Sequence, residues 1–202
     1  MSEPDPKTAS PRNRVSGPAA AILAAALLLA VGAIWFVWMP QTGRTSLIGG
    51  PFALEDGDGR TVTDASFRGR PFLVYFGYTH CPDVCPTELA RIADALSAMG
   101  DKAIPAVFIT VDPERDTPKV VQDYVSSFGA HVIGLSGPPQ AVGQAERAFR
   151  VFARKGDVRP DGDYSMDHSS VVYLMDKSGR FVEALNVDRP PAEVARELAS
   201  YL

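Results

Sequence analysis

Residues Tyr75–Leu89 read Tyr-Phe-Gly-Tyr-Thr-His-Cys-Pro-Asp-Val-Cys-Pro-Thr-Glu-Leu and hold both cysteines of the chain, Cys81 and Cys85. An apolar run of β-forming residues, Phe72–Phe76, leads into this stretch. A helical pattern of apolar residues over Thr87–Met99 leads out of it. The two thiols are therefore expected where a strand turns into a helix, which is a place suited to sulfur or metal chemistry.

The local structure of this stretch depends on Pro86. Because a proline disfavours the α region for the residue before it, the helix is predicted to begin at Pro86 or Thr87, with Cys85 at its cap and Cys81 in the preceding loop. The dipole of a helix favours an anion at its N-terminus, and this lowers the pKa of a nearby cysteine. The stretch therefore predicts two reactive thiols.

Two plainer interpretations of the cysteines compete with this one. A structural disulfide between Cys81 and Cys85 would close so short a loop that it would stabilise the fold by only about 2 kcal/mol. Such a bridge would also tie no distant elements together. A pair of inert buried cysteines is disfavoured by the adjacent prolines and by Asp83.

Length and composition limit the class of protein. The chain has 202 residues, which is enough for a membrane anchor and one domain of ordinary size. From Thr45 onward it carries 16 Lys and Arg against 22 Asp and Glu, a balance of −6. An acidic domain of this kind does not indicate a nucleic-acid binder. Two cysteines so close together do not make a disulfide scaffold.

An uninterrupted apolar run of 21 residues, Ala19–Met39, lies between Pro18 and Pro40. A run of this length spans the core of a bilayer as a helix, and two tryptophans near its end suit the membrane interface. A cleaved signal peptide is the alternative, but its apolar region is usually shorter and ends in small residues. Residues 18–40 are therefore predicted to be a single transmembrane anchor.

The segment before the anchor, Met1–Gly17, is polar and is predicted to be a disordered tail. Lys7, Arg12 and Arg14 precede the anchor, whereas Arg44 alone follows it closely. The positive-inside rule therefore places the tail in the cytoplasm and the domain across the inner membrane. That compartment is the periplasm in a bacterium and the intermembrane space in a mitochondrion.

The rest of the chain divides into a linker, 41–50, and a folded domain, 51–202. Besides Phe72–Phe76, strands are expected over Pro51–Glu55, Arg60–Thr63, Ala103–Val111, His131–Leu135, Ser170–Met175 and Arg180–Leu185. Besides Thr87–Met99, helices are expected over Pro118–Phe128, with Thr117 as its cap, and over Pro138–Phe149 and Pro190–Leu202. Strands that alternate with helices imply an α/β sheet with parallel pairs, here closed by an antiparallel hairpin. A dithiol that follows an early strand at the start of a helix is the layout of a thioredoxin-like fold.

His168 is the strongest candidate for a third ligand beside the two thiols. It lies in the segment Tyr164–Ser170, just before the strand of the last hairpin, and in a thioredoxin-like fold this loop faces the dithiol. Thioredoxins usually carry a cis-proline there, whereas the nearest prolines of this chain are Pro160 and Pro190. A histidine at this place predicts a metal ligand. Asp167 would either orient it or remain a solvated charge.

The other two histidines are weaker candidates. His80 adjoins Cys81, so its direction is constrained and it can point away from the thiols. His131 begins a strand, where a structural or surface role is expected. Two thiolates and an imidazole suit Cu(I), and zinc with an open fourth position is an alternative that the residues leave open.

These motifs together resemble the SCO/SenC family of copper chaperones. The resemblance rests on Gly49–Leu54, Tyr75–Leu89, Val111–Thr117 and the pair Asp167 and His168, and it runs from about Ile48 to Leu202. The sequence Cys-Pro-Asp-Val-Cys-Pro with a downstream Asp-His is specific, whereas two cysteines at this spacing alone would be a weak signal.

The resemblance implies a thioredoxin-like fold and one copper, as Cu(I) or Cu(II), held by Cys81, Cys85 and His168. It also implies a metallochaperone that receives copper from an upstream donor and delivers it to the binuclear copper site of cytochrome c oxidase subunit II. The alternative function within the family is a thiol–disulfide oxidoreductase that reduces the cysteines of that subunit, with Cys81 and Cys85 as its redox-active pair. His168 and the missing cis-proline favour the chaperone over the enzyme.

Overall fold

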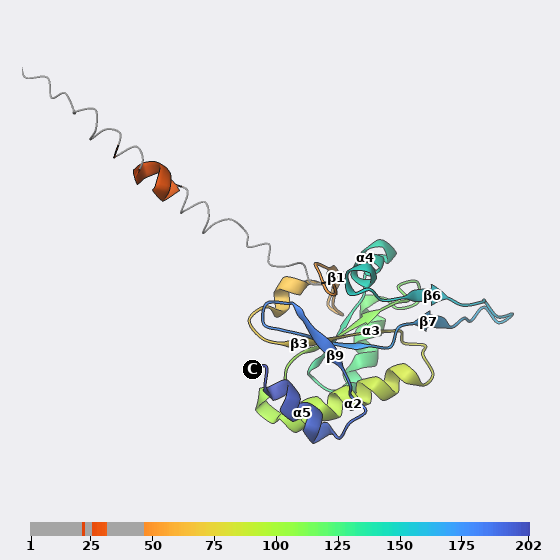
Figure 1. Cartoon of the computed structure of the whole chain (residues 1–202). Coiled ribbons are helices and arrows are strands. Elements are labelled where there is room, and N and C mark those ends of the chain that lie inside the picture. The colour runs from red at the N-terminus through yellow and green to blue at the C-terminus, as the bar shows by residue number, and fades with distance from the viewer. Residues whose placement is uncertain (1–21, 23–25, 32–46) are drawn as a thin grey trace, which may run out of the picture. The chain divides into compact units, whose positions relative to one another are not determined.

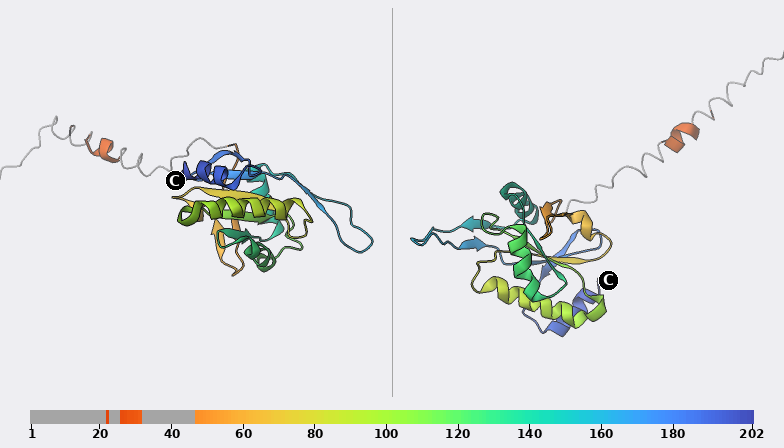
Figure 2. Two further views of the ribbon diagram at one scale, coloured as in Figure 1. Left: turned by 90° about the horizontal axis from the view of Figure 1, so that it is seen from below. Right: turned by 180° about the vertical axis from the view of Figure 1, so that it is seen from behind.

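The structure is a computed structural model that describes Ile22, residues 26–31 and residues 47–202. Its contacts divide the chain into two units, Met1–Thr45 and Ser46–Leu202. The second unit is the folded domain that carries both cysteines and His168 (Figure 1, Figure 2).

The predicted anchor, 18–40, lies mostly outside the described residues. Ile22 and residues 26–31 are helical and exposed. Among all the residues that are described, no helix combines the length and the apolar character needed to cross a membrane. The predicted tail, 1–17, and residues 41–46 of the predicted linker also lie outside the described part of the chain. The anchor, its orientation and the domain boundaries therefore stay predictions.

A five-stranded sheet forms the centre of the domain, with the strand order β5-β4-β3-β8-β9. The strands are β3 (Phe72–Gly77), β4 (Ala106–Thr110), β5 (Val132–Leu135), β8 (Val172–Met175) and β9 (Phe181–Leu185). β4 runs parallel to β3 and β5, whereas β8 pairs antiparallel with β3 and β9. All six residues of β3 are buried, which agrees with its apolar sequence and its central place.

Helices cover both faces of this sheet. They are α2 (Val84–Met99), α3 (Pro118–Val125), α4 (Pro139–Phe149) and α5 (Pro191–Ala199), with short 3₁₀ turns at Asp64–Phe67, Gly100–Lys102 and Ser126–Phe128. α2 and α5 lie side by side on one face, whereas α4 lies on the other face near the hairpin of β1 (Ala53–Glu55) and β2 (Thr61–Thr63) (Figure 1, Figure 2). The predicted cap of α3 is confirmed, because the side chain of Thr117 accepts a hydrogen bond from the backbone N–H of Val120.

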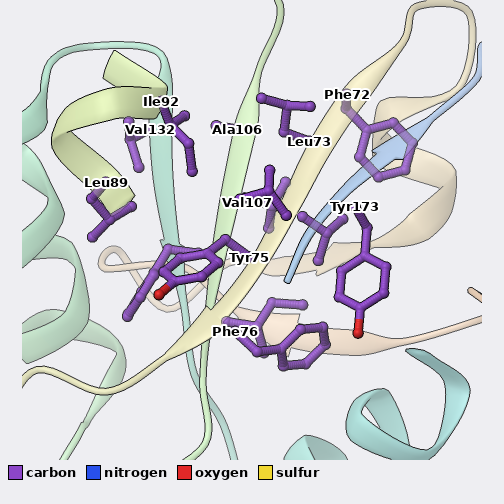
Figure 3. Close-up of a cluster of buried hydrophobic side chains, with 14 of the residues drawn as sticks. Phe72, Leu73, Tyr75, Phe76, Leu89, Ile92, Ala106, Val107, Val132 and Tyr173 are labelled. Atoms are coloured by element: carbon purple, nitrogen blue, oxygen red, sulfur yellow. The ribbon is translucent and has the colours of Figure 1, made fainter. Parts of the chain in front are cut away.

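The alternation of side chains along β3 decides which helix meets which face of the sheet. Phe76 points to the α4 face, where its ring centroid lies 5.4 Å from that of Phe149. Tyr75 points to the opposite face, on the side of Leu89 and Ile92 of α2 (Figure 3). Because buried side chains pack against both faces, β3 is held firmly, and the residues that follow it start from a rigid base.

The α/β sheet with parallel pairs and the closing hairpin are confirmed. β8 and β9 pair antiparallel, and the backbone N–H of Asp176 donates to the carbonyl oxygen of Arg180 at 2.8 Å. Gly179 completes the turn with a φ of +79°, in the left-handed region that favours glycine.

The predicted start of the helix after the cysteines is wrong. α2 begins at Val84, with Asp83 at its cap, so Cys85 lies inside the first turn rather than at the cap. The early start is allowed because the first N–H groups of a helix have no acceptor within it. Pro86, at the third helical position, therefore forfeits no hydrogen bond.

The loop predicted around His168 is also wrong, because that region contains two short strands. β6 (Ala153–Lys155) and β7 (Met166–His168) pair antiparallel in a separate two-stranded sheet of three residue pairs. Residues 153–168, named here the arm, form a long hairpin that projects from the central sheet (Figure 1, Figure 2). Strands of this length are too short to show an alternating pattern in the sequence.

Candidate metal centre

Three side chains from two distant parts of the chain converge near the end of β3, where α2 begins. The Sγ atoms of Cys81 and Cys85 and a ring nitrogen of His168 all lie within 4.8 Å of one another. Both cysteines carry free thiols. The structure thus brings together the three residues that the sequence singles out as candidate metal ligands.

Cys85 reaches this point because the strand and the helix approach each other closely. Its side chain is fully buried in the first turn of α2. A Cβ atom at Gly77, the last residue of β3, would lie 2.9 Å from the Cys85 Sγ atom and 2.8 Å from Cε2 of Phe108. The backbone N–H of Cys85 donates to the Sγ atom of Cys81 at 3.4 Å. Gly77 is not among the residues predicted from the sequence, although a glycine between an apolar strand and the thiols is a usable signal.

His168 comes from β7, at the base of the arm. Its Nε2 atom lies 3.5 Å from the Sγ atom of Cys85, and its Nδ1 atom lies 3.1 Å from the carbonyl oxygen of Ser169. Because a carbonyl only accepts, the proton is assigned to Nδ1, and Nε2 presents a lone pair to the thiols. The ring of Tyr78 stands edge-on to the imidazole, with centroids 5.7 Å apart and an interplanar angle of 88°. The imidazole is therefore oriented from two sides.

Burial is the main cause of the pKa shifts of Cys85 and His168. It raises the pKa of the Cys85 thiol to about 12, although a hydrogen bond from the backbone of Tyr78 opposes the shift. Burial also lowers the pKa of His168, against the smaller opposite effect of its hydrogen bond to Ser169. The prediction that the helix N-terminus lowers the cysteine pKa is therefore wrong for Cys85, because lost solvation outweighs the dipole. A metal ion that binds Cys85 as a thiolate must displace its proton.

A buried carboxylate shapes the turn that leads to Cys81. Asp116 is fully buried and accepts hydrogen bonds from the backbone N–H of Thr79 at 3.0 Å and from the hydroxyls of Thr79 and Thr110, each at 2.6 Å. These donors offset the cost of burying the charge. They also join the turn before Cys81 to the end of β4. This role of Asp116 is not predicted from the sequence, because it depends on contacts with Thr79, 37 positions away.

The two weaker histidine candidates lie outside the cluster. The Nδ1 atom of His80 lies 3.1 Å from the hydroxyl of Thr79, and its side chain is half exposed. His131 is exposed in the loop before β5. Both positions agree with the plainer role that the sequence analysis weighs for them.

Asp167 does not orient the imidazole. It precedes His168 on β7, so its side chain points to the opposite face of the strand, where it pairs with Arg154 at 2.8 Å. Of the two alternatives left open, Asp167 is the solvated charge. The backbone carbonyl of Ser169 fills the orienting role instead.

Comparison with known proteins identifies the family of this chain. The family model described as SCO1/SenC matches residues 40–202. The chain belongs to the SCO1/SenC family. The match includes both cysteines, His168 and the whole of the central sheet.

Relatives in the SCO1/SenC family occur in mitochondria and bacteria. The chain is 40% identical over 169 residues to "Protein SCO1 homolog 1, mitochondrial" of Arabidopsis thaliana and 36% identical over 162 residues to "Protein SCO1 homolog, mitochondrial" of Homo sapiens. These alignments cover 80% and 77% of this chain but 50% and 53% of the relatives, so the chain spans about half their length. It is also 36% identical over 188 residues to "SCO2-like protein RP587" of Rickettsia prowazekii, covering 86% of this chain and 92% of that protein.

Solved structures of Sco proteins share the fold. Copper-bound ScoI of Bradyrhizobium japonicum is 52% identical with a TM-score of 0.74, and the match covers 77% of this chain and 99% of that one. Copper-bound ScoI of Arabidopsis thaliana is 38% identical with a TM-score of 0.70, covering 76% and 97%. BsSco, described as a member of the Sco family of cytochrome c oxidase assembly proteins, is 22% identical with a TM-score of 0.62, covering 79% and 95%, and shows the fold alone. The predicted thioredoxin-like α/β fold is confirmed as the Sco fold.

The cluster in this SCO1/SenC protein has the composition and the size that a copper ion requires. Two thiolates and an imidazole suit Cu(I). Ligand atoms around one ion with such bonds lie roughly 3.5–4 Å apart, and the three ligand atoms here lie within 4.8 Å of one another. Together with the copper-bound Sco relatives, this cluster confirms copper as the expected metal.

Proposed function

We propose that this protein is a copper metallochaperone, which binds copper and hands it over without catalytic turnover. Cys81, Cys85 and His168 are the proposed ligands. The observation that carries the proposal is the lone pair of His168 Nε2, which faces the Sγ atom of Cys85 at 3.5 Å inside a cluster of three ligand atoms. A pair of cysteines that only exchanges disulfides does not require an imidazole lone pair directed at its buried sulfur.

The unequal exposure of the ligands suits a transfer reaction. Cys85 is buried and Cys81 is partly exposed, whereas His168 belongs to a sheet of three residue pairs. Thiolate or imidazole ligands of an acceptor can therefore replace His168 and Cys81 first and Cys85 last. The ion changes its ligands and keeps its oxidation state. The two released thiolates of this protein regain protons, which the thiols of the acceptor lose as they bind the ion.

We further propose that the copper is destined for the binuclear site of cytochrome c oxidase subunit II and that an upstream protein donates it. Membership of the SCO1/SenC family supports this destination, since Sco proteins are named as cytochrome c oxidase assembly proteins. The acidic domain suits a cationic cargo and gives no support for nucleic acid as a partner.

A thiol–disulfide oxidoreductase, acting on that subunit or on another exported protein, is the second candidate. The closeness of the two sulfur atoms, which lie within 4.8 Å of each other, favours it, because the two thiols can close to a disulfide after a small movement. The pKa of Cys85, raised to about 12 by burial, weakens it. Cys85 is buried whereas Cys81 is partly exposed, so Cys81 is the thiol that would attack a partner disulfide.

The variant His168→Ala separates the two candidates. The full chain carrying this change should hold Cu(I) at least about 10–100-fold more weakly, since even changes beside a metal ligand cost that much. Cells that contain only the variant should fail to load copper into the oxidase. Its disulfide should still form and be reduced at a rate within a few-fold of the parent's. Unchanged oxidase activity despite lost copper binding would favour the reductase.

We also propose that residues 18–40 anchor the protein in the inner membrane, in contact with lipid, with the domain in the periplasm or the intermembrane space. The apolar run Ala19–Met39 and the basic residues before it support this topology. Protease added to the outer side of intact inner membranes should remove the domain and leave the N-terminus protected. A soluble domain that lacks the residues before about 42 would instead indicate a cleaved signal peptide.

A further inference from the structure

His168 depends on support from outside its own sheet. β6 and β7 are joined by three residue pairs, with one further backbone hydrogen bond beyond each end of the ladder, from Gly156 to Ser165 and from Ser169 to Phe152. An isolated two-stranded hairpin of this size is marginally stable in water. The arm is not a member of the five-stranded sheet that holds the core. The position of the imidazole relative to the two thiols therefore depends on what fastens the arm to the domain.

A cluster around Arg115 provides such a fastening. Arg115 lies in the turn after β4, and its Nε atom donates to the carboxylate of Asp112 at 2.5 Å while Nη1 donates to Asp163 of the arm at 2.7 Å. The Arg115 side chain is 18% exposed and that of Asp112 is 3% exposed. The Arg115–Asp112 pair is therefore shielded from solvent, which strengthens a charge-assisted pair, whereas the Asp163 side chain on the arm is 43% exposed.

Tyr164 joins the same cluster from the arm. Its hydroxyl donates to Asp112 at 2.8 Å, and the centroid of its ring lies 3.6 Å from the guanidinium carbon of Arg115. Lys155, on β6, also contacts this ring at 3.9 Å and pairs with Glu114 at 2.6 Å. Both ends of the arm's hairpin are thus fastened to residues 112–115 of the same turn.

The cluster around Arg115 adjoins the metal centre through Tyr164 and Tyr78. Tyr164 stands four residues before His168, at the entry to β7, so a shift of Tyr164 moves the strand that carries the imidazole. Arg115 also lies 6.0 Å from the ring of Tyr78, which stands edge-on to His168. The Nη2 atom of Arg115 is buried and finds no hydrogen-bond acceptor among the described residues, which fits a guanidinium placed for stacking rather than for solvation.

We propose that Arg115, paired with Asp112 and stacked on Tyr164, is a positioning residue that fastens the arm and so holds the Nε2 atom of His168 beside the two thiols. The inference rests on the proposed function, because it gives the arm the task of completing a three-ligand site. Arg115 itself touches no ligand atom in this account; it acts through the placement of His168.

A double-mutant cycle on the full chain tests this role. Arg115→Met removes the guanidinium group and keeps an unbranched apolar side chain. It should weaken Cu(I) binding at least about 10-fold, measured in competition with a chromogenic Cu(I) chelator. In the His168→Ala background the same change should alter the affinity less than about 2-fold, since no imidazole remains to be positioned. An equal loss in both backgrounds, or an unchanged affinity in the parent background, would overturn the proposal.

A matched control and a milder variant show whether a loss of Cu(I) affinity comes from misfolding. Arg91 also pairs with two carboxylates, Glu88 at 2.9 Å and Asp188 at 2.5 Å, but it lies on α2 away from the arm. Arg91→Met should leave the Cu(I) affinity unchanged. Tyr164→Phe keeps the stacked ring and removes only the hydrogen bond to Asp112, so it should weaken binding a few-fold and depend on His168 in the same way.

Hydrogen exchange of the metal-free protein tests the fastening without copper. The backbone N–H of Ser169 donates to the carbonyl oxygen of Phe152 at 2.9 Å, at the base of the arm. Arg115→Met should raise its exchange rate at least about 10-fold and leave the amides of β3 unchanged. Unaltered exchange would overturn the fastening even if copper binding changed. If His168→Ala alone leaves the copper affinity intact, the three-ligand site fails while the fastening is still decided by exchange.

Discussion

The Nε2 atom of His168 lies 3.5 Å from the Sγ atom of Cys85, although the two residues are 83 positions apart in the chain. The first turn of α2 supplies the sulfur, and a separate two-stranded arm supplies the nitrogen. The metal centre is therefore assembled from a rigid part and a weakly supported part. Changes to the packing of either part should be visible in copper affinity.

Gly77→Ala should damage the rigid part. The new Cβ atom would lie 2.9 Å from the Cys85 Sγ atom and 2.8 Å from the Phe108 ring, and overpacking of this kind costs about 1–3 kcal/mol of unfolding free energy. The displaced sulfur should also weaken Cu(I) binding. Denaturant unfolding and chelator competition measure the two effects.

Gly143→Ala is the matched control for that substitution. Gly143 lies within α4, and the nearest atom to a new Cβ there is the flexible Nη1 of Arg147 at 3.3 Å. Alanine is favoured over glycine inside a helix by up to about 1 kcal/mol, so this variant should be as stable as the parent or more stable. A Gly77→Ala variant that matched it in both measurements would show that the close approach of Cys85 is not needed.

The two cysteines should differ in their importance for stability. Cys85→Ser buries a hydroxyl where the sulfur is fully buried, which should lower the free energy of unfolding by about 1–3 kcal/mol. Cys81 is partly exposed, so Cys81→Ser should cost less than about 1 kcal/mol. Both variants should lose Cu(I) binding. Unfolding of the metal-free, reduced proteins checks the asymmetry, and equal costs would contradict the burial argument.

Oxidation should abolish the site without unfolding the domain. Cys81 and Cys85 are close enough for air to join them in a disulfide, which removes both thiolates from copper binding. The oxidised protein should take up no Cu(I), and a reductant should restore one equivalent. Full uptake of Cu(I) by the oxidised protein would remove the dithiolate from the site.

The sequence was sufficient for those features that a long pattern or a local motif encodes. The apolar run of β3, the cap at Thr117 and the turn at Gly179 each depend on neighbours in the chain, and the structure agrees with them. The convergence of Cys81, Cys85 and His168 followed from the expected fold.

Other features depend on contacts that no local pattern reveals. β6 and β7 are too short to alternate recognisably, and the hairpin that they form contacts Arg115 and Asp112, which lie 48 and 52 positions before their partners Asp163 and Tyr164. The raised pKa of Cys85 follows from burial, whereas the sequence showed only its nearness to a helix start. The two strands and the raised pKa were not predicted because both depend on tertiary packing, which overrides local signals in the sequence.

Asp176 should give the domain a pH-dependent share of its stability. Burial alone would raise the pKa of Asp176, but hydrogen bonds from Ser178 and Arg180 together outweigh it and lower the pKa to about 2. Because the folded pKa lies below the unfolded one, this stabilisation is present above about pH 4 and is lost as the pH falls towards 2. The group is partly exposed to solvent, so its share should be about 1–2 kcal/mol.

Asp176→Asn tests that share. Between about pH 5 and about pH 2, Asp176→Asn should lose less unfolding free energy than the parent, by this amount. Asp94→Asn, at an exposed position on α2, serves as the control and should follow the parent. Parallel pH profiles for the parent and Asp176→Asn would show that the turn hydrogen bonds do not favour the ionised carboxyl.

X-ray absorption at the copper edge of the Cu(I)-loaded full chain tests the central claim most directly. The account predicts two sulfur neighbours and one nitrogen neighbour with the outer-shell scattering of an imidazole. In His168→Ala the imidazole signal should disappear while both sulfur neighbours remain. The same imidazole signal in the variant, or a parent spectrum without two sulfur neighbours, would contradict a site made of Cys81, Cys85 and His168.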